Sequence, residues 1–96
     1  MLFLSELAGT AILVTLGNGV VADVFLERSK GQNSGWIVIT TGWGIAMMCG
    51  LFVATALGGP GWLNPAVALT ALFRPHPDVA GVLAGMAGEC LGGCLG

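Results

Sequence analysis

The residues of this sequence that could do chemistry gather in the stretch Gly58–Val67. Asn64 is a preferred N-cap residue and Pro65 a preferred first helical residue, so a helix is expected to begin here. The run Arg74-Pro75-His76-Pro77 ends it after about nine residues, or about 12–14 Å, which is under half a bilayer. Such a half-helix within a membrane carries a positive end and unpaired N–H groups, and broken backbone is tolerated there only where protein buries it or where it lines a wet cavity. The stretch therefore predicts a pore.

Pore chemistry consists of hydrogen-bond acceptors and donors arranged around a solute that has lost part of its water. The carbonyl groups of an extended segment over Gly59, Pro60, Gly61 and Trp62 would supply acceptors. The amide nitrogen of Asn64 would supply a donor, because its oxygen is occupied as the helix cap. The positive helix end behind it is expected to repel cations, including hydronium.

Other chemistry is excluded by the residue types present. The sequence holds no Ser/His/Asp or Cys/His set and no glycine-rich phosphate loop after a strand, so we expect no enzyme and no catalytic residues. Cys49, Cys90 and Cys94 form no CxxC pair and are interpreted as small packing residues, so neither a metal site nor a cofactor is expected. A net charge of -2 with no basic patch indicates no nucleic-acid partner.

The composition indicates an integral membrane protein. Hydrophobic residues make up 55% of the chain and charged residues 8%, against ~25% charged in soluble domains, and the mean hydropathy is +0.90. The fold class is therefore all-α, with spanning helices at 2–22 and 36–57, the start of a third at 79–96, and a re-entrant loop with its half-helix at 58–73. Loops are expected at 23–35 and 74–78. Glycines three or four residues apart in 79–96 predict a nearly flat face that can meet another helix closely.

Two acidic residues interrupt apolar segments. Glu6 is the only charged residue inside the first helix, and an ionisable group at that depth is a functional hypothesis, although a solvated position near the interface is an equal alternative. Glu89 lies in the third helix and is expected to be neutral or hydrogen-bonded within protein, because a bare carboxylate in lipid is expensive.

Leu63-Asn64-Pro65-Ala66-Val67 resembles the first Asn-Pro-Ala box of the aquaporin and glycerol-facilitator (major intrinsic protein) family. Further segments resemble its bacterial glycerol-facilitator branch, in order along the chain: Glu6-Leu7-Ala8-Gly9-Thr10, Leu16-Gly17-Asn18-Gly19-Val20-Val21, Ser34-Gly35-Trp36-Ile37-Val38-Ile39-Thr40 and Gly42-Trp43-Gly44. The resemblance implies an aquaporin-like fold in which this chain is the first half of an inverted repeat, and we expect it to be a fragment of a longer channel. It also implies a multi-pass protein of the cell membrane that is a homotetramer when full length.

The resemblance also implies residue roles. It makes Glu6 a buried acceptor for the backbone of the loop before the box, and Trp43 the apolar wall of the selectivity region, with a buried packing role as the alternative. Asn64, Pro65 and Ala66 would form the box itself. The family usually has His where Trp62 stands, which together with Pro60 puts the local carbonyl geometry in question. Glu89 stands where the family commonly has Gln, and supports the structure.

The resemblance implies a passive channel for glycerol, small polyols and similar neutral solutes, with water following. A water-selective aquaporin is one alternative, against which Trp43 and the glycerol-branch segments argue. The other is a non-transporting helical assembly subunit that uses its glycine faces for packing. That alternative leaves the box, the half-helix and Glu6 unexplained together.

Overall fold

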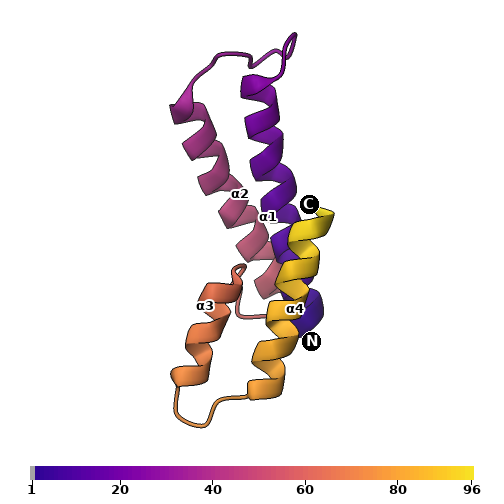
Figure 1. Cartoon of the computed structure of the whole chain (residues 1–96), viewed down its shortest axis with the longest axis vertical. Helices are drawn as coiled ribbons and strands as arrows, with labels where there is room; N and C mark the ends of the chain where they lie inside the picture. Colours follow the sequence, from indigo (N-terminus) through magenta and orange to yellow (C-terminus); the bar gives the residue numbers. More distant parts are fainter. Residues whose placement is uncertain (1) are drawn as a thin grey trace.

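The computed structural model describes residues 2–96, which form four α-helices and one 3-10 turn. In order these are α1 (Leu2–Phe25), α2 (Trp36–Ala56), α3 (Pro65–Thr70), η1 (Ala71–Phe73) and α4 (Val79–Leu95). The molecule is elongated, with extents of 51 × 20 × 20 Å. Figure 1 shows α1 at the centre of this rod, with α2 returning beside it and α4 packed along the part of α1 nearer the N-terminus. The short α3 lies against α4, to which a turn connects it.

Close contact between α1 and α2 depends on a pair of facing glycines. A Cβ added at Gly9 would lie 2.8 Å from the carbonyl oxygen of Gly50, and one added at Gly50 would lie 2.6 Å from that of Gly9. Real Cβ atoms essentially never approach this closely, so only glycine lets these two backbones meet. Leu13, Ala46 and Ala54 fill the buried core beside this crossing.

Glycines likewise set the contact between α1 and α4. A Cβ at Gly88 or Gly92 would overlap the backbone carbonyl oxygen of Phe3 or Leu7, respectively. The flat glycine face predicted from the sequence is therefore present, and α1 is the helix that it meets. Because α4 approaches the α1 backbone directly, side chains flanking the glycines on both helices are brought within hydrogen-bonding reach of the same loop.

The helix ends follow local signals. The first helix extends three residues beyond the predicted end at 22, to Phe25, and the second ends one residue early, at Ala56. The predicted half-helix is an α-helical segment of six residues followed by the 3-10 turn η1. Helix α4 begins where the Asp78 side chain accepts a hydrogen bond from the N–H of Gly81 at 3.0 Å.

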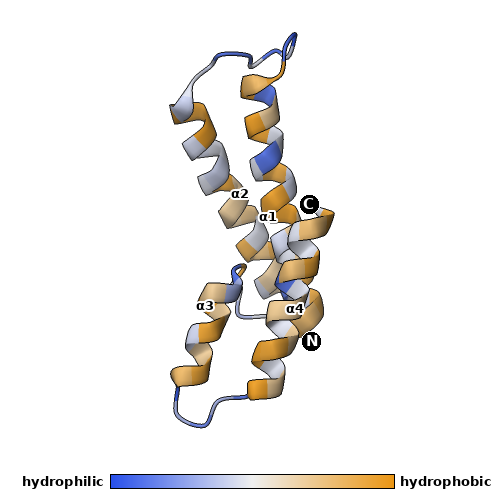
Figure 2. Ribbon diagram, viewed as in Figure 1, coloured by the Kyte–Doolittle hydropathy of each residue, from blue (hydrophilic) through white to orange (hydrophobic). Residues whose placement is uncertain are grey.

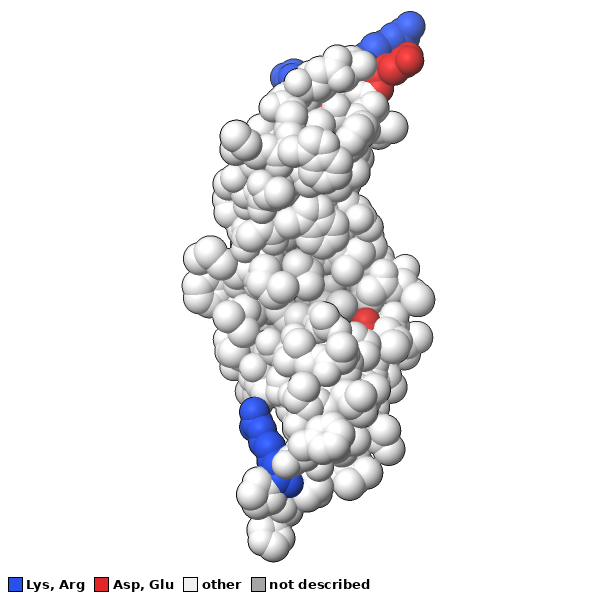
Figure 3. Space-filling view, turned by 60° about the vertical axis from the view of Figure 1, so that its left-hand side comes forward, with Lys and Arg blue, Asp and Glu red and all other residues white. Residues whose placement is uncertain are grey.

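Among residues 2–96, two helices, α1 and α2, are long and apolar enough to cross a membrane. Helix α4 is apolar but has 17 residues, about 26 Å at 1.5 Å each, so a third spanning helix stays a prediction. Figure 2 shows hydrophilic residues in the loops at the two ends of the rod. On the face drawn in Figure 3, charged atoms lie at these two ends, apart from one small acidic spot between them.

Candidate functional site

The start of α3 is capped as the sequence predicts. Asn64 has an extended backbone (φ -160°, ψ 120°), and its side-chain Oδ1 accepts a hydrogen bond from the N–H of Ala66 at 2.9 Å. Pro65 occupies the first helical turn, where its missing N–H costs nothing. With Oδ1 used by the cap, the Asn64 amide nitrogen has no acceptor among residues 2–96, and the residue is exposed. A donor is therefore free at the positive end of this short helix.

Glu6 holds the loop that leads to this cap. Its carboxylate is fully buried and accepts three backbone N–H groups of the loop. Oε1 accepts from Gly61 at 2.8 Å and from Trp62 at 3.2 Å, and Oε2 accepts from Leu63 at 2.8 Å. The predicted reach of Glu6 to this loop is confirmed, and its solvated alternative is wrong. Successive N–H groups turned to one side form a concavity that binds anions, and here the carboxylate is that anion.

Glu89 takes the next N–H of the same loop. Its side chain comes from α4 and is 1% exposed, and its Oε1 accepts from the N–H of Asn64 at 3.0 Å. Four consecutive N–H groups, those of residues 61–64, are thus bound by two carboxyl groups from two helices. Glu89 Oε2 is buried and has no donor among the described residues.

The loop backbone differs from the extended segment that the sequence analysis assumed. Gly61 and Leu63 have positive φ values of 69° and 56°, in the left-handed region. Alternation along an extended strand would turn neighbouring N–H groups to opposite sides, whereas these left-handed residues turn them together toward Glu6. No hydrogen bond found among residues 2–96 uses the carbonyl groups of 59–62. The expected free acceptors are therefore present, although the loop is not extended throughout.

Leu63 anchors the loop on the apolar side, a role that sequence reasoning missed. Its side chain is 4% exposed and packs in the core with Leu13, Ala46 and Ala54. A left-handed conformation costs a residue with a side chain roughly 1–2 kcal/mol, so burial and the bond to Glu6 must hold it there. A leucine before the box carries no local signal for this conformation.

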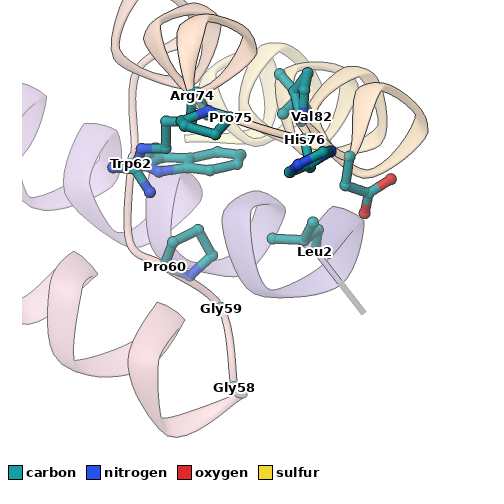
Figure 4. Close-up of a pocket in the computed structure, with 12 residues that line it drawn as sticks. Leu2, Gly58, Gly59, Pro60, Trp62, Arg74, Pro75, His76 and Val82 are labelled. Atoms are coloured by element: carbon teal, nitrogen blue, oxygen red, sulfur yellow. The ribbon is translucent and has the colours of Figure 1, made fainter.

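Trp62 lies at the edge of a cavity of about 480 Å³. The cavity is bounded by the loop residues 58–60, by the start of α1 and α4, and by the turn 74–78. Figure 4 shows the indole of Trp62 between Pro60 and the Arg74–Pro75 segment, with His76 on the other side of the cavity near Leu2 and Val82. The ring packs on Gly85 of α4, where an added Cβ would lie 3.1 Å from it. Trp62, which stands where the family usually has His, thus packs on Gly85 of α4, and its ring lines the cavity.

Trp43 lies apart from this loop. Its ring rests on Gly17 of α1, where an added Cβ would overlap it, and it borders the same apolar core. Gly17 is eleven residues beyond Glu6 on the helix, about 16 Å along its axis. The indole is only partly buried, so its packing contact with Gly17 leaves part of the ring accessible. Sequence reasoning missed Gly17 as its support, although a glycine in one helix opposite a tryptophan in the next could have suggested it.

These features define an all-helical membrane protein with a capped short helix and a loop held from one side. The family model described as Major intrinsic protein matches residues 2–96. The chain belongs to the major intrinsic protein family, whose members are membrane channels and not enzymes.

Curated relatives agree with this assignment. The chain is 49% identical over 71 residues to a "Probable glycerol uptake facilitator protein" of Thermotoga maritima, covering 74% of this chain and 30% of that protein. It is 46% identical over 91 residues to the "Glycerol uptake facilitator protein" of a Streptococcus pneumoniae strain, covering 95% and 38%. It is 44% identical over 93 residues to "Glycerol uptake facilitator protein 3" of Lactiplantibacillus plantarum, covering 97% and 38%. The chain thus spans less than two fifths of these relatives' length. No solved structure matches it.

Proposed function

We propose that this chain forms part of a passive membrane channel for glycerol and related small neutral solutes, with water. The observation that carries the proposal is the one-sided binding of the loop. Carboxyl groups take the N–H groups of residues 61–64, whereas the carbonyl groups of 59–62 and the Asn64 amide nitrogen have no hydrogen-bond partner within the described part of the chain, 2–96. A row of fixed acceptors ending in a donor suits a polyol, whose hydroxyl groups both donate and accept. The relatives' names supply the solute class.

Further parts of the proposal rest on family membership. The channel would lie in the cell membrane as a multi-pass protein, with lipid against the exposed apolar faces of α1, α2 and α4. It would be completed by a second half of the inverted repeat and would assemble as a homotetramer. In it, Pro65 and Ala66 start the half-helix, Trp62 borders the path beside the loop, and Trp43 forms the apolar wall of the narrow region.

A swelling assay on vesicles containing the channel tests the proposed path at Asn64. Asn64→Ala removes a cap worth about 1 kcal/mol together with the free donor, so glycerol and water flux and folded yield should all fall. Asn64→Asp keeps the cap acceptor and removes the donor, so it should restore folded yield but not glycerol flux. If Asn64→Asp conducts glycerol like the unmodified channel, the amide nitrogen is not a pore donor.

The same assay tests Trp43 against its packing alternative. Trp43→Ala should relax size selection and admit a five-carbon polyol, because the ring would no longer narrow the path. The matched control is Trp36→Ala, since Trp36 is exposed at the start of α2 and contacts Phe25 edge-on. Unchanged permeability ratios in Trp43→Ala would make Trp43 a packing residue. A channel that swells with water but never with glycerol would favour the water-selective alternative, and no swelling at all would favour an assembly subunit.

A further inference from the structure

Two buried carboxyl groups from different helices meet behind the loop. Glu6 of α1 and Glu89 of α4 are 0% and 1% exposed, and they accept hydrogen bonds from the neighbouring backbone N–H groups of Leu63 and Asn64. The cationic side chains Arg28, Lys30 and Arg74 are all exposed in the loops outside the helices. Among residues 2–96, the pair is therefore stabilised by backbone N–H groups and not by a cationic side chain.

Two ionised carboxylates can only accept hydrogen bonds, so a bond between these two neighbouring groups would require a proton on one of them. The two carboxyl groups differ in the hydrogen bonds that they already accept, and this difference indicates which of them carries the proton. Glu6 accepts three N–H groups through both oxygens, so neither oxygen is without a donor. Glu89 accepts one N–H through Oε1, and its Oε2 is buried without a donor. A proton on Glu89 would turn this group into a donor and end the contact between like charges.

We propose that Glu89 holds the loop as a protonated acid that donates to Glu6, so that the pair carries one negative charge. Glu89 is then a positioning residue that fixes the N–H of Asn64, and through it the start of α3, by a contact that depends on a bound proton. Loss of that proton would place two negative charges together away from water, which is strongly unfavourable. The contact is then expected to open, with α4 moving away from the loop.

The surroundings leave few other groups that could titrate in this way. Among residues 2–96, α1 contributes Glu6 to the pair, and the loop at 61–64 contributes backbone N–H groups. The neighbouring Cys90 is exposed on α4. Glu89 is thus the group to which we assign the proton at this contact.

The test compares Glu89→Gln with Glu89→Ala in purified protein containing this chain. Glutamine keeps an acceptor for the Asn64 N–H and an N–H donor toward Glu6, and so imitates the protonated acid without titrating. Infrared spectra at neutral pH should contain a protonated carboxyl band that Glu89→Gln removes. The control Glu27→Gln alters an exposed loop acid and should leave that band in place.

Stability against pH gives the second measurement. The folded state binds a proton that an exposed glutamate releases in mildly acidic solution, so stability of the unmodified protein should fall as pH rises above that range. At mildly acidic pH, Glu89→Gln should be as stable as the unmodified protein. Its stability should not show the decrease with rising pH that titration of Glu89 causes. Glu89→Ala should shift the unfolding equilibrium by about tenfold or more at every pH, as expected for a lost buried hydrogen bond.

Neither measurement requires transport, so failure of this inference is distinct from failure of the proposed function. The proposal is wrong if the unmodified protein has no protonated carboxyl band in the infrared spectrum. It is also wrong if Glu89→Gln leaves such a band in place. Equal damage by Glu89→Gln and Glu89→Ala would also overturn it, because a protonated acid and an amide should be interchangeable at this contact.

Discussion

Replacing Glu6 should show how strongly the loop depends on one carboxylate. In Glu6→Ala the N–H groups of Gly61, Trp62 and Leu63 lose their acceptor. A buried donor left without a partner costs about 1–3 kcal/mol, so three would cost roughly 3–9 kcal/mol. If each bond has the ~0.6 kcal/mol average found within membranes, the total is about 2 kcal/mol. Either value is a large share of the 5–15 kcal/mol that stabilises a typical native protein.

Glu6→Gln should be milder, because the amide retains one acceptor oxygen. With that oxygen in the place of Oε1, the bonds from Gly61 and Trp62 remain, whereas the N–H of Leu63 faces an amide donor. We expect a loss of about 1–3 kcal/mol, that is, one unsatisfied donor. The Leu63 conformation should be the first to relax, because its positive φ depends on this bond.

The assay is denaturation of the purified protein in detergent, together with vesicle permeability normalised to folded protein. The expected order of stability is the unmodified protein, then Glu6→Gln, then Glu6→Ala. Glu27→Gln and Glu27→Ala are matched controls on an exposed loop acid and should both be nearly neutral. Equal stability and transport for the two Glu6 variants would refute the account, because oxygens that accept three N–H groups cannot be dispensable.

Two glycine pairs test the packing. Gly17→Ala would push a methyl group into the ring of Trp43 and should cost about 1–3 kcal/mol and change the solute selectivity, whereas Gly19→Ala, with open space around it, should be neutral or stabilising. In Gly92→Ala the new methyl group would overlap the α1 backbone, so the loss of stability should again be about 1–3 kcal/mol. Gly93→Ala faces open space and should not lower the stability. Thermal unfolding measures both pairs, and equal effects within either pair would contradict the packing described.

Local chemistry explains why much of the architecture could be predicted. The long apolar runs predicted α1 and α2, and Asn64-Pro65 predicted the start of α3, because capping depends on residues two positions apart. The loop conformation could not be predicted in the same way. Gly61 has the freedom to adopt a positive φ, but Leu63 adopts it only because of partners distant in the sequence.

The partners of Glu6 and Glu89 lie beyond any local pattern. Glu6 binds N–H groups 55 to 57 residues away, and a family resemblance predicted that contact where spacing could not. The hydrogen bond from the Asn64 N–H to Glu89 forms only because the glycine face of α4 packs on α1. The spacing of the glycines predicts such a face but does not indicate which helix packs on it. The contact between Gly17 and Trp43 could be predicted only from the register between α1 and α2. In the structure, the facing pair Gly9 and Gly50 sets that register.

The register of α4 on α1 explains how two acids reach one loop. Gly88 and Gly92 flank Glu89 in sequence, and both lie on the α1 backbone, so Glu89 is held at the depth of Glu6 without adjustment of its own helix. The carboxyl groups then take the N–H groups of 61–64 from the protein side, and the loop must direct its carbonyl groups elsewhere. The glycine contact thus positions the acceptor of the Asn64 N–H, whereas Glu6 of α1 holds the other three N–H groups whether or not α4 stays in place.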